Sequence, residues 1–201
     1  MVFSADELKK APNTTGVILD FPLETEFYWL QQFLPDHKTI GVLFSTAENR
    51  RKIEEAGHIA QRMGLTLVAR EVETPQGLPE ALNSLSNRVD VLWAVADHLI
   101  LSPQLAKSLL LYSFRSRIPF VGVSEPWVKA GALYALDRDY TDVGIQCGEM
   151  AVKVIREQKR INELPPVAPR KVMYSLNLHT ARQMSLTIPP ALIQGAHQVF
   201  Q

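Results

Sequence analysis

Residues 39–72 read TIGVLFSTAENRRKIEEAGHIAQRMGLTLVAREV, with an apolar run at each end and a segment of helical spacing between them. The runs, 39–44 and 65–72, are short and rich in large apolar residues, as in strands that are buried on both faces of a parallel sheet. Gly64 follows the middle segment where a helix would end. The apolar positions of that segment recur every three or four residues, at Ile53, Ala56, Ala60 and Met63. The stretch therefore predicts one β–α–β unit.

This alternation continues along the chain to residue 136. The same patterns predict strands at 89–96, 119–123 and 132–136 and helices at 78–85 and 103–117. Strands that alternate with helices form parallel sheets with right-handed crossovers. The fold predicted for residues 39–136 is therefore an α/β doubly wound parallel-sheet sandwich.

The segments on either side of this region have a different pattern. Helices are expected at 21–34 and 139–158, and the prolines of 161–170 predict an extended connector rather than a helix. The remaining expected elements are a strand at 171–177 and two short helices near 178–184 and 190–200. This order indicates a chain that leaves its main domain and returns to it.

The composition is that of an ordinary globular protein, since 46% of the 201 residues are hydrophobic and 21% are charged. The 21 basic and 21 acidic side chains balance, which argues against a nucleic-acid partner. A single cysteine, Cys147, excludes an internal disulfide and a cysteine-based metal cluster. No apolar run in the sequence is long enough to cross a membrane, and residues 1–12 lack the pattern of a signal peptide. The chain is therefore expected to be cytoplasmic if the sequence is complete.

Polar residues follow the expected strands at their carboxyl ends, where open parallel sheets bind ligands. After the first strand, Ser45 and Glu48 have the spacing of a capping box, which by itself explains both residues as a helix cap. Alternatively, Ser45, Thr46 and Asn49 offer donors to the carboxylate of a ligand. The sequence leaves both interpretations open.

Two further strand ends carry candidate binding residues. Asp97 and His98 follow the third strand, and Asp97 either binds the ammonium group of a ligand or is a solvated turn residue. His98 has no partner at the spacing of a catalytic motif. Glu125 and Trp127 follow the fourth strand, and Trp127 either stacks on a ligand or anchors its loop in the core. These positions complete the predicted ligand-binding site.

Motifs of catalysis and of cofactor binding are missing from the sequence. It contains no GxGxxG, GxxxxGK[ST], GxSxG or HExxH, and its five histidines show no metal-ligand spacing. Cys147 lies on the apolar side of its expected helix, as a small core hydrophobe does. We therefore expect no cofactor, no metal and no enzymatic activity. A small α/β enzyme that uses His98 or Cys147 is the least supported hypothesis.

An ordered series of short motifs runs through the chain: TTGV (14–17), LPDHKTIGVLFS (34–45), VDVLWAVAD (89–97), IPFVGVSEPWVKAGALYAL (118–136), DYTDVGIQCGEMAVKVI (139–155) and SLNLHTARQMSLTIPPALI (175–193). The series resembles the substrate-binding proteins of an ABC importer family, which have the type 1 periplasmic-binding-protein fold and some of which bind aromatic amino acids. The resemblance implies one complete ligand-binding lobe, 22–138 plus 168–201. It makes 1–21 and 139–167 remnants of the N-terminal lobe and of the hinge crossovers, with a strand at 2–5.

The predicted site residues agree with the pattern of this family only in part. The positions that match it in kind are Ser45, Glu48, Asn49, Asp97, Glu125 and Tyr140. Arg50 and His98 stand where the family usually has other residues. Asp97 is also the residue that the strand-end argument selects independently, so it is the strongest candidate for a ligand contact.

The resemblance implies a solute-binding component of an ABC importer, located in the periplasm or elsewhere outside the cytoplasm. It would bind a small amino-acid-like ligand in a cleft between lobes and work with an ABC permease. The alternative is a cytoplasmic ligand-sensing or regulatory domain that uses the same lobe without transport.

The same resemblance implies an unpaired surface. Without the other lobe, the apolar face of helix 139–158 would face water, with Val143, Cys147, Ala151, Val154 and Ile155. A homo-oligomer or a swapped dimer through 2–5 and 139–158 is therefore expected.

Overall fold

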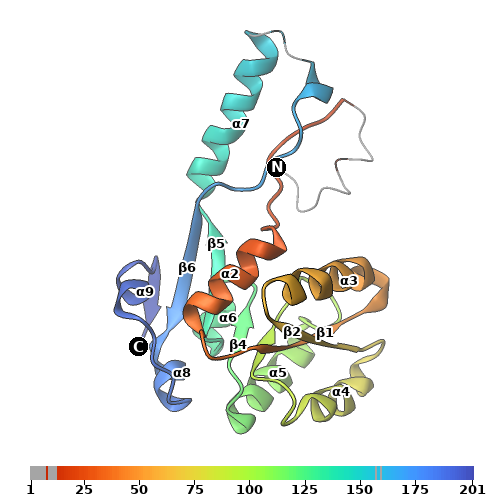
Figure 1. The fold of residues 1–201 in the computed structure, drawn as a ribbon, viewed down its shortest axis with the longest axis vertical. Coiled ribbons are helices and arrows are strands. Elements are labelled where there is room, and N and C mark those ends of the chain that lie inside the picture. Colours follow the sequence, from red (N-terminus) through yellow and green to blue (C-terminus); the bar gives the residue numbers. More distant parts are fainter. Residues whose placement is uncertain (1–7, 9–12, 157, 159) are drawn as a thin grey trace. The chain divides into compact units, whose positions relative to one another are not determined.

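The computed structural model describes residues 8, 13–156, 158 and 160–201 (Figure 1). The strand expected at 2–5 lies outside the described residues. The chain divides into two compact units, which we call the first unit (Met1–Thr25 with Asp137–Met173) and the second unit (Glu26–Leu136 with Tyr174–Gln201). The assignment of 22–138 and 168–201 to one lobe of a receptor stays a prediction.

Among the described residues, seven strands form one sheet in the order β2-β1-β3-β4-β5-β6-β7. Their bounds are β1 (Thr39–Phe44), β2 (Thr66–Glu71), β3 (Val91–Trp93), β4 (Phe120–Gly122), β5 (Tyr134–Arg138), β6 (Val172–Asn177) and β7 (Gln198–Phe200). The pairs β1–β2, β1–β3, β3–β4, β4–β5 and β6–β7 are parallel. The mostly parallel sheet confirms the predicted α/β class.

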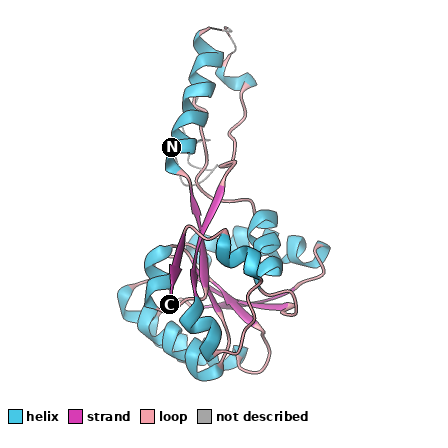
Figure 2. Ribbon diagram, turned by 90° about the vertical axis from the view of Figure 1, so that its left-hand side faces the viewer, coloured by secondary structure: helices cyan, strands magenta, loops and turns pink. Residues whose placement is uncertain are grey.

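Helices lie on both faces of the strands in the second unit (Figure 2). The helices of the described chain are α2 (Leu23–Phe33), α3 (Thr46–Arg62), α4 (Leu78–Leu85), α5 (Pro103–Ser116), α6 (Glu125–Ala130), α7 (Tyr140–Ile155), α8 (Leu178–Gln183) and α9 (Pro190–Gln194). The alternation from β1 to β5 confirms the doubly wound sandwich expected for 39–136. The short helix α6 was not expected from the sequence, because six residues are too few to show a helical period.

Apolar side chains from α4 and α5 form one core cluster with residues of the neighbouring strands. Among its members are Leu82 and Leu85 from α4, Leu109 from α5, and Leu92 and Phe120 from β3 and β4. All five are buried. The apolar spacing that predicted these helices and strands is therefore the spacing of their buried face.

The last residues of the chain correct one prediction. A helix was expected near 190–200, but α9 ends at Gln194 and β7 pairs in parallel with β6. At Gly195 an added Cβ would lie 2.6 Å from the hydroxyl of Tyr174, so a side chain there would clash. The backbone N–H of His197 donates to the carbonyl of Tyr174 at 2.9 Å and starts the pairing. The prediction was wrong because an available strand edge outweighed a short local apolar pattern.

In the first unit, α7 is covered on one side by the segment that contains Val17 and Leu19. These two residues form a buried cluster with Val143, and Cys147 and Met150 pack against it. The backbone N–H of Ile18 donates to the carbonyl of Val167 at 2.8 Å, which holds the covering segment against the proline-containing connector. The expectation that Val143 faces water is therefore wrong, and Cys147 packs beside it half-buried, whereas Ala151 and Ile155 are exposed as expected.

The connector itself is also bound to α7. The guanidinium of Arg170 donates to Asp142 at 2.9 Å and to Glu149 at 3.0 Å. The side-chain amide of Gln146 donates to the carbonyl of Ala168 and accepts from the N–H of Arg170, each at 3.2 Å. Apart from a short 3-10 turn at Ile161–Glu163, the connector is extended, as the prolines predicted.

The other side of α7 is exposed and partly apolar. Ile145, Val152 and Ile155 lie there, and 77% of Ile155 is accessible to solvent. Gly144 and Gly148 lie on the same side, and a Cβ added to either would meet no atom within 4 Å. In the described part of the chain, no helix combines the length and the apolar character that a membrane span requires.

Candidate ligand-binding site

The predicted site residues follow three strands that are neighbours in the sheet of the second unit. Ser45 follows β1, Asp97 lies in the loop after β3, and Glu125 begins the helix after β4. Since β1, β3 and β4 are parallel and adjacent, their carboxyl ends lie at the same edge of the sheet. The structure therefore places these residues at one edge rather than on unrelated surfaces.

Asp97 is the centre of a buried hydrogen-bond network at this edge. Its Oδ2 accepts from the Ser45 backbone N–H at 2.7 Å, from the Ser45 hydroxyl at 2.8 Å and from the Asn49 amide at 2.9 Å. Its Oδ1 accepts from the N–H groups of Leu99 and Ile100, both at 3.1 Å. A carboxylate has about four lone-pair positions, so these five donors occupy its capacity. Asp97 thus joins the start of α3 to the loop after β3.

This network decides two of the alternatives that the sequence left open. Asp97 is only 3% exposed, so the interpretation as a solvated turn residue is wrong. Ser45 is the N-cap residue of α3, but its side chain makes no capping hydrogen bond and donates to Asp97 instead. The capping-box interpretation is therefore wrong as well, because the buried carboxylate is an acceptor for the Ser45 hydroxyl. A direct contact of Asp97 with a ligand stays a prediction.

The same contacts explain the ionisation of Asp97. Burial raises the pKa of its carboxyl group, but hydrogen bonds from the N–H groups of Ser45 and Ile100 and from the side chains of Ser45 and Asn49 outweigh this effect. The pKa of Asp97 therefore lies below its ordinary value of 3.8. Asp97 is a carboxylate at neutral pH.

A second, exposed contact lies beside the buried network. The Nδ1 atom of His98 lies 2.9 Å from Oε2 of Glu48, and the backbone N–H of His98 donates to the same oxygen at 3.2 Å. The hydrogen bond to Glu48 raises the pKa of His98 above 6.5, and the negative charges of Glu48 and Asp97 act in the same direction. The sequence singled out Glu48 as a possible cap and as a position that matches the family pattern, but gave it no partner. The structure makes it the partner of His98.

Thr46 has a partner that the sequence did not indicate. Its hydroxyl donates to the carboxylate of Glu71, the last residue of β2. Because β2 neighbours β1 in parallel, Glu71 lies at the same edge as Ser45. Its place at the carboxyl end of an expected strand is the signal that could have identified it.

Glu125 and Trp127 are half-buried residues of α6. The indole ring of Trp127 lies 5.5 Å from the ring of Phe120, centroid to centroid, and packs against the core cluster of α4 and α5. A Cβ added to Gly122 would lie 2.8 Å from the Cβ of Trp127, so the glycine lets α6 pack closely on β4. These contacts favour Trp127 as an anchor of its loop, and stacking on a ligand stays a prediction.

A cavity of about 400 Å³ lies at the opposite edge, among the loops that precede the strands. Its lining includes Asp36 and His37 before β1, Asn87 and Asp90 before β3, and Arg117 before β4. None of the residues predicted as ligand contacts lines this cavity. The cavity is therefore separate from the predicted site, which consists of residues that follow β1, β3 and β4.

A sheet with polar residues at adjacent carboxyl ends has the arrangement at which open α/β proteins bind their ligands. The family model described as ABC transporter substrate binding protein matches residues 5–200. The chain belongs to this family, which confirms the resemblance seen in the sequence. Proteins of the family bind substrates, and membership lends no support to an enzyme built on His98 or Cys147.

Known relatives extend the comparison. A tyrosine-binding protein of Clostridioides difficile (strain R20291) is 26% identical over 180 residues, which are 89% of this chain and 51% of the relative. The chain thus spans about half the length of this curated relative.

Two solved structures share the fold. One is the ABC domain in complex with L-Trp from Streptococcus pneumonia, with a TM-score of 0.71, 24% identity, and 92% of this chain and 63% of that chain covered. The other is the ligand-free, open structure of a substrate binding protein with adhesive properties from Clostridium difficile, with a TM-score of 0.74, 24% identity, and coverage of 93% and 62%. Both confirm the periplasmic-binding-protein-like fold.

Proposed function

We propose that this chain is the solute-binding component of an ABC importer, or a part of one, and that it binds a small amino acid at the edge formed by β1, β3 and β4. The observation that carries the proposal is the Asp97 network, which fixes the start of α3 against the loop after β3. A preorganised edge binds a ligand with less loss of conformational entropy. The tyrosine-binding relative makes an aromatic amino acid the first ligand to test.

The chemistry of the edge suits both charged groups of an amino acid. The first turn of α3 has backbone N–H groups that lack partners within the helix, and a ligand carboxylate is stabilised there. Glu48 and Glu125 supply carboxylates for the ammonium group, and neither is buried. Asp97 holds Ser45 and Asn49 in place at the start of α3.

The location and the membrane partner belong to the same proposal. A solute-binding component of this kind works outside the cytoplasm and delivers its ligand to an ABC permease. Fractionation of cells that produce the natural protein, with detection by an antibody, tests the location. Recovery from the cytoplasm alone would contradict a role in transport and favour a sensory domain.

The ligand itself is predicted to be recognised through both of its charged groups. L-Tyrosine and L-tryptophan are expected to raise the thermal unfolding temperature. At a ligand concentration of 100 times Kd, binding adds about 2.7 kcal/mol to the free energy of unfolding. Tyramine and tryptamine lack the carboxylate, and the corresponding arylpropionic acids lack the ammonium group. We expect both kinds of analogue to stabilise the protein less, and equal stabilisation by all of them would contradict the site chemistry.

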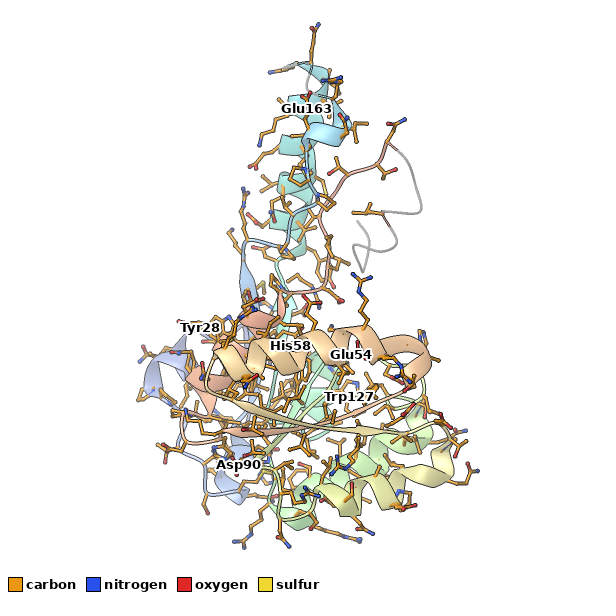
Figure 3. The ribbon with its side chains drawn as sticks, turned by 45° about the vertical axis from the view of Figure 1, so that its right-hand side comes forward. Tyr28, Glu54, His58, Asp90, Trp127 and Glu163 are labelled. Atoms are coloured by element: carbon orange, nitrogen blue, oxygen red, sulfur yellow. The ribbon has the colours of Figure 1, made fainter. Side chains whose placement is uncertain are left out.

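A matched pair of variants tests the role of Glu125. Glu125→Gln is expected to weaken ligand binding about five- to tenfold, since it removes one charge-assisted hydrogen bond. Glu54→Gln is the control, because Glu54 is an exposed carboxylate on α3 that the proposal does not use (Figure 3). Equal affinities of the two variants would exclude Glu125 as the ammonium partner.

Self-association through α7 is also part of the proposal. The exposed side with Ile145, Val152 and Ile155 is an apolar surface of a kind that soluble monomers seldom leave open, and a second copy of the chain would cover it. Ile155→Glu is expected to shift the chain toward the monomer in light scattering at high protein concentration. Lys153→Gln on the same helix is the control, because it changes the net charge by the same one unit. A monomeric wild-type chain would refute this part of the proposal.

A further inference from the structure

Two carboxylates at the binding edge differ in their access to a ligand. The carboxylate of Asp97 already accepts hydrogen bonds from five protein donors, and the residue is almost fully buried. The side chain of Glu48 is 36% exposed, and among the described residues the donors at its Oε2 are the backbone N–H and the Nδ1 of His98. An ammonium group that arrives at the start of α3 therefore meets the carboxylate of Glu48 rather than that of Asp97.

The imidazole of His98 already occupies this carboxylate. The side chain of His98 is 97% exposed. The hydrogen bond from the backbone N–H of His98 to Oε2 of Glu48 nevertheless holds the residue so that its Nδ1 lies 2.9 Å from that oxygen. The backbone of His98 is fixed in turn, because Asp97 is tied to Ser45 and Asn49. His98 is thus a positioned cation whenever it is protonated.

We propose that His98 and the ammonium group of the ligand compete for the carboxylate of Glu48, so that acid weakens ligand binding. The inference rests on the proposed function and names its regulation. Protonated His98 acts in two ways: it forms an ion pair with Glu48, and its charge repels the ammonium group. Neutral His98 does neither, and Glu48 is then available to the ligand.

The direction of the effect follows from the charges that act on His98. These are Glu48 from α3 and Asp97 from its own loop, and both are negative. They keep His98 protonated to a higher pH than an isolated histidine, so the competition begins at a higher pH and grows as the pH falls.

Isothermal titration of the chain with L-tyrosine and L-tryptophan tests the inference. Exposed ion pairs are weak, so we expect Kd to be about two- to fivefold higher at about pH 5.5 than at about pH 8. His98→Gln is expected to remove this dependence. His58→Gln is the matched control and should retain the pH dependence, because His58 is also exposed but lies on α3, away from the contact of His98 with Glu48 (Figure 3).

Each outcome decides between the inference and the proposed function. Tighter binding in acid would mean that His98 contacts the ligand carboxylate, and it would overturn the inference alone; equal binding at both pH values would do the same. Absence of binding at both pH values would overturn the proposed function and the inference with it.

A second readout follows the histidine directly. In NMR titrations of the free chain, we expect the pKa of His98 to lie above 6.5 and to fall toward it in Glu48→Gln. Because linkage is reciprocal, saturating ligand should also lower the pKa of His98 in the wild-type chain. A His98 titration that neither Glu48→Gln nor ligand changes would overturn the inference.

Discussion

Asp97→Ala is expected to lower the free energy of unfolding by roughly 2–4 kcal/mol, because it removes an acceptor that serves buried donors. The backbone N–H of Ser45 and the amide of Asn49 would lose their partners at Oδ2, and both residues are buried. Urea unfolding followed by circular dichroism measures the loss. Because the start of α3 would no longer be fixed, ligand affinity should fall too.

The pH dependence of stability supplies an independent check on Asp97. A carboxyl group whose pKa is lower in the folded than in the unfolded state stabilises the fold above its unfolded-state pKa. The contribution of Asp97 is therefore fully present above 3.8 and is lost as the pH falls through its lower folded value. The wild-type chain should lose more stability than Asp97→Ala over this acidic range.

The control for this variant is Asp36→Ala, which removes an exposed carboxylate from the opposite edge of the sheet. Surface substitutions of this kind change stability by no more than about 0.5 kcal/mol. If Asp97→Ala were as mild as Asp36→Ala, the network would not organise the edge. The proposed mode of ligand binding would then lose its structural basis.

Phe33→Ala is the substitution with the largest expected effect on the fold, a loss of about 3–5 kcal/mol. Phe33 is the last residue of α2 and is 1% exposed. Its ring stacks on that of Tyr134 with 4.0 Å between the centroids, and it meets the ring of Tyr174 edge-on at 5.2 Å. The substitution would leave a cavity between α2 and the strands β5 and β6.

Tyr28→Ala is the matched control, since Tyr28 is an aromatic residue of the same helix that is 52% exposed (Figure 3). We expect it to cost less than about 1 kcal/mol. Thermal and urea unfolding of the two variants, compared with the wild-type chain, gives the difference. Similar losses for both would show that the contacts of Phe33 with Tyr134 and Tyr174 do not stabilise the second unit.

The strands from β1 to β5 and the helices α3, α4 and α5 could be predicted from the sequence because their apolar periods are local, whereas α6 is too short to show one. The short segment 39–44 contains a buried apolar run by itself. In α3, Ile53, Ala56 and Ala60 are buried on the inner face, as their spacing predicted. The parallel arrangement then placed Ser45, Asp97 and Glu125 at one edge. Each of these predictions depends on the spacing of apolar residues within one short segment of the chain.

The sequence by itself thus determined the α/β class, the order of its main elements and the edge at which polar residues gather. Only the tertiary structure decided that Asp97 is buried with five donors, that Glu48 pairs with His98 and that Val143 is covered by Val17. It also decided that the chain ends in a strand. The physical reason is that each of these outcomes depends on a contact between residues that are distant in sequence. The local order of apolar and polar residues does not show which distant partner a side chain will contact.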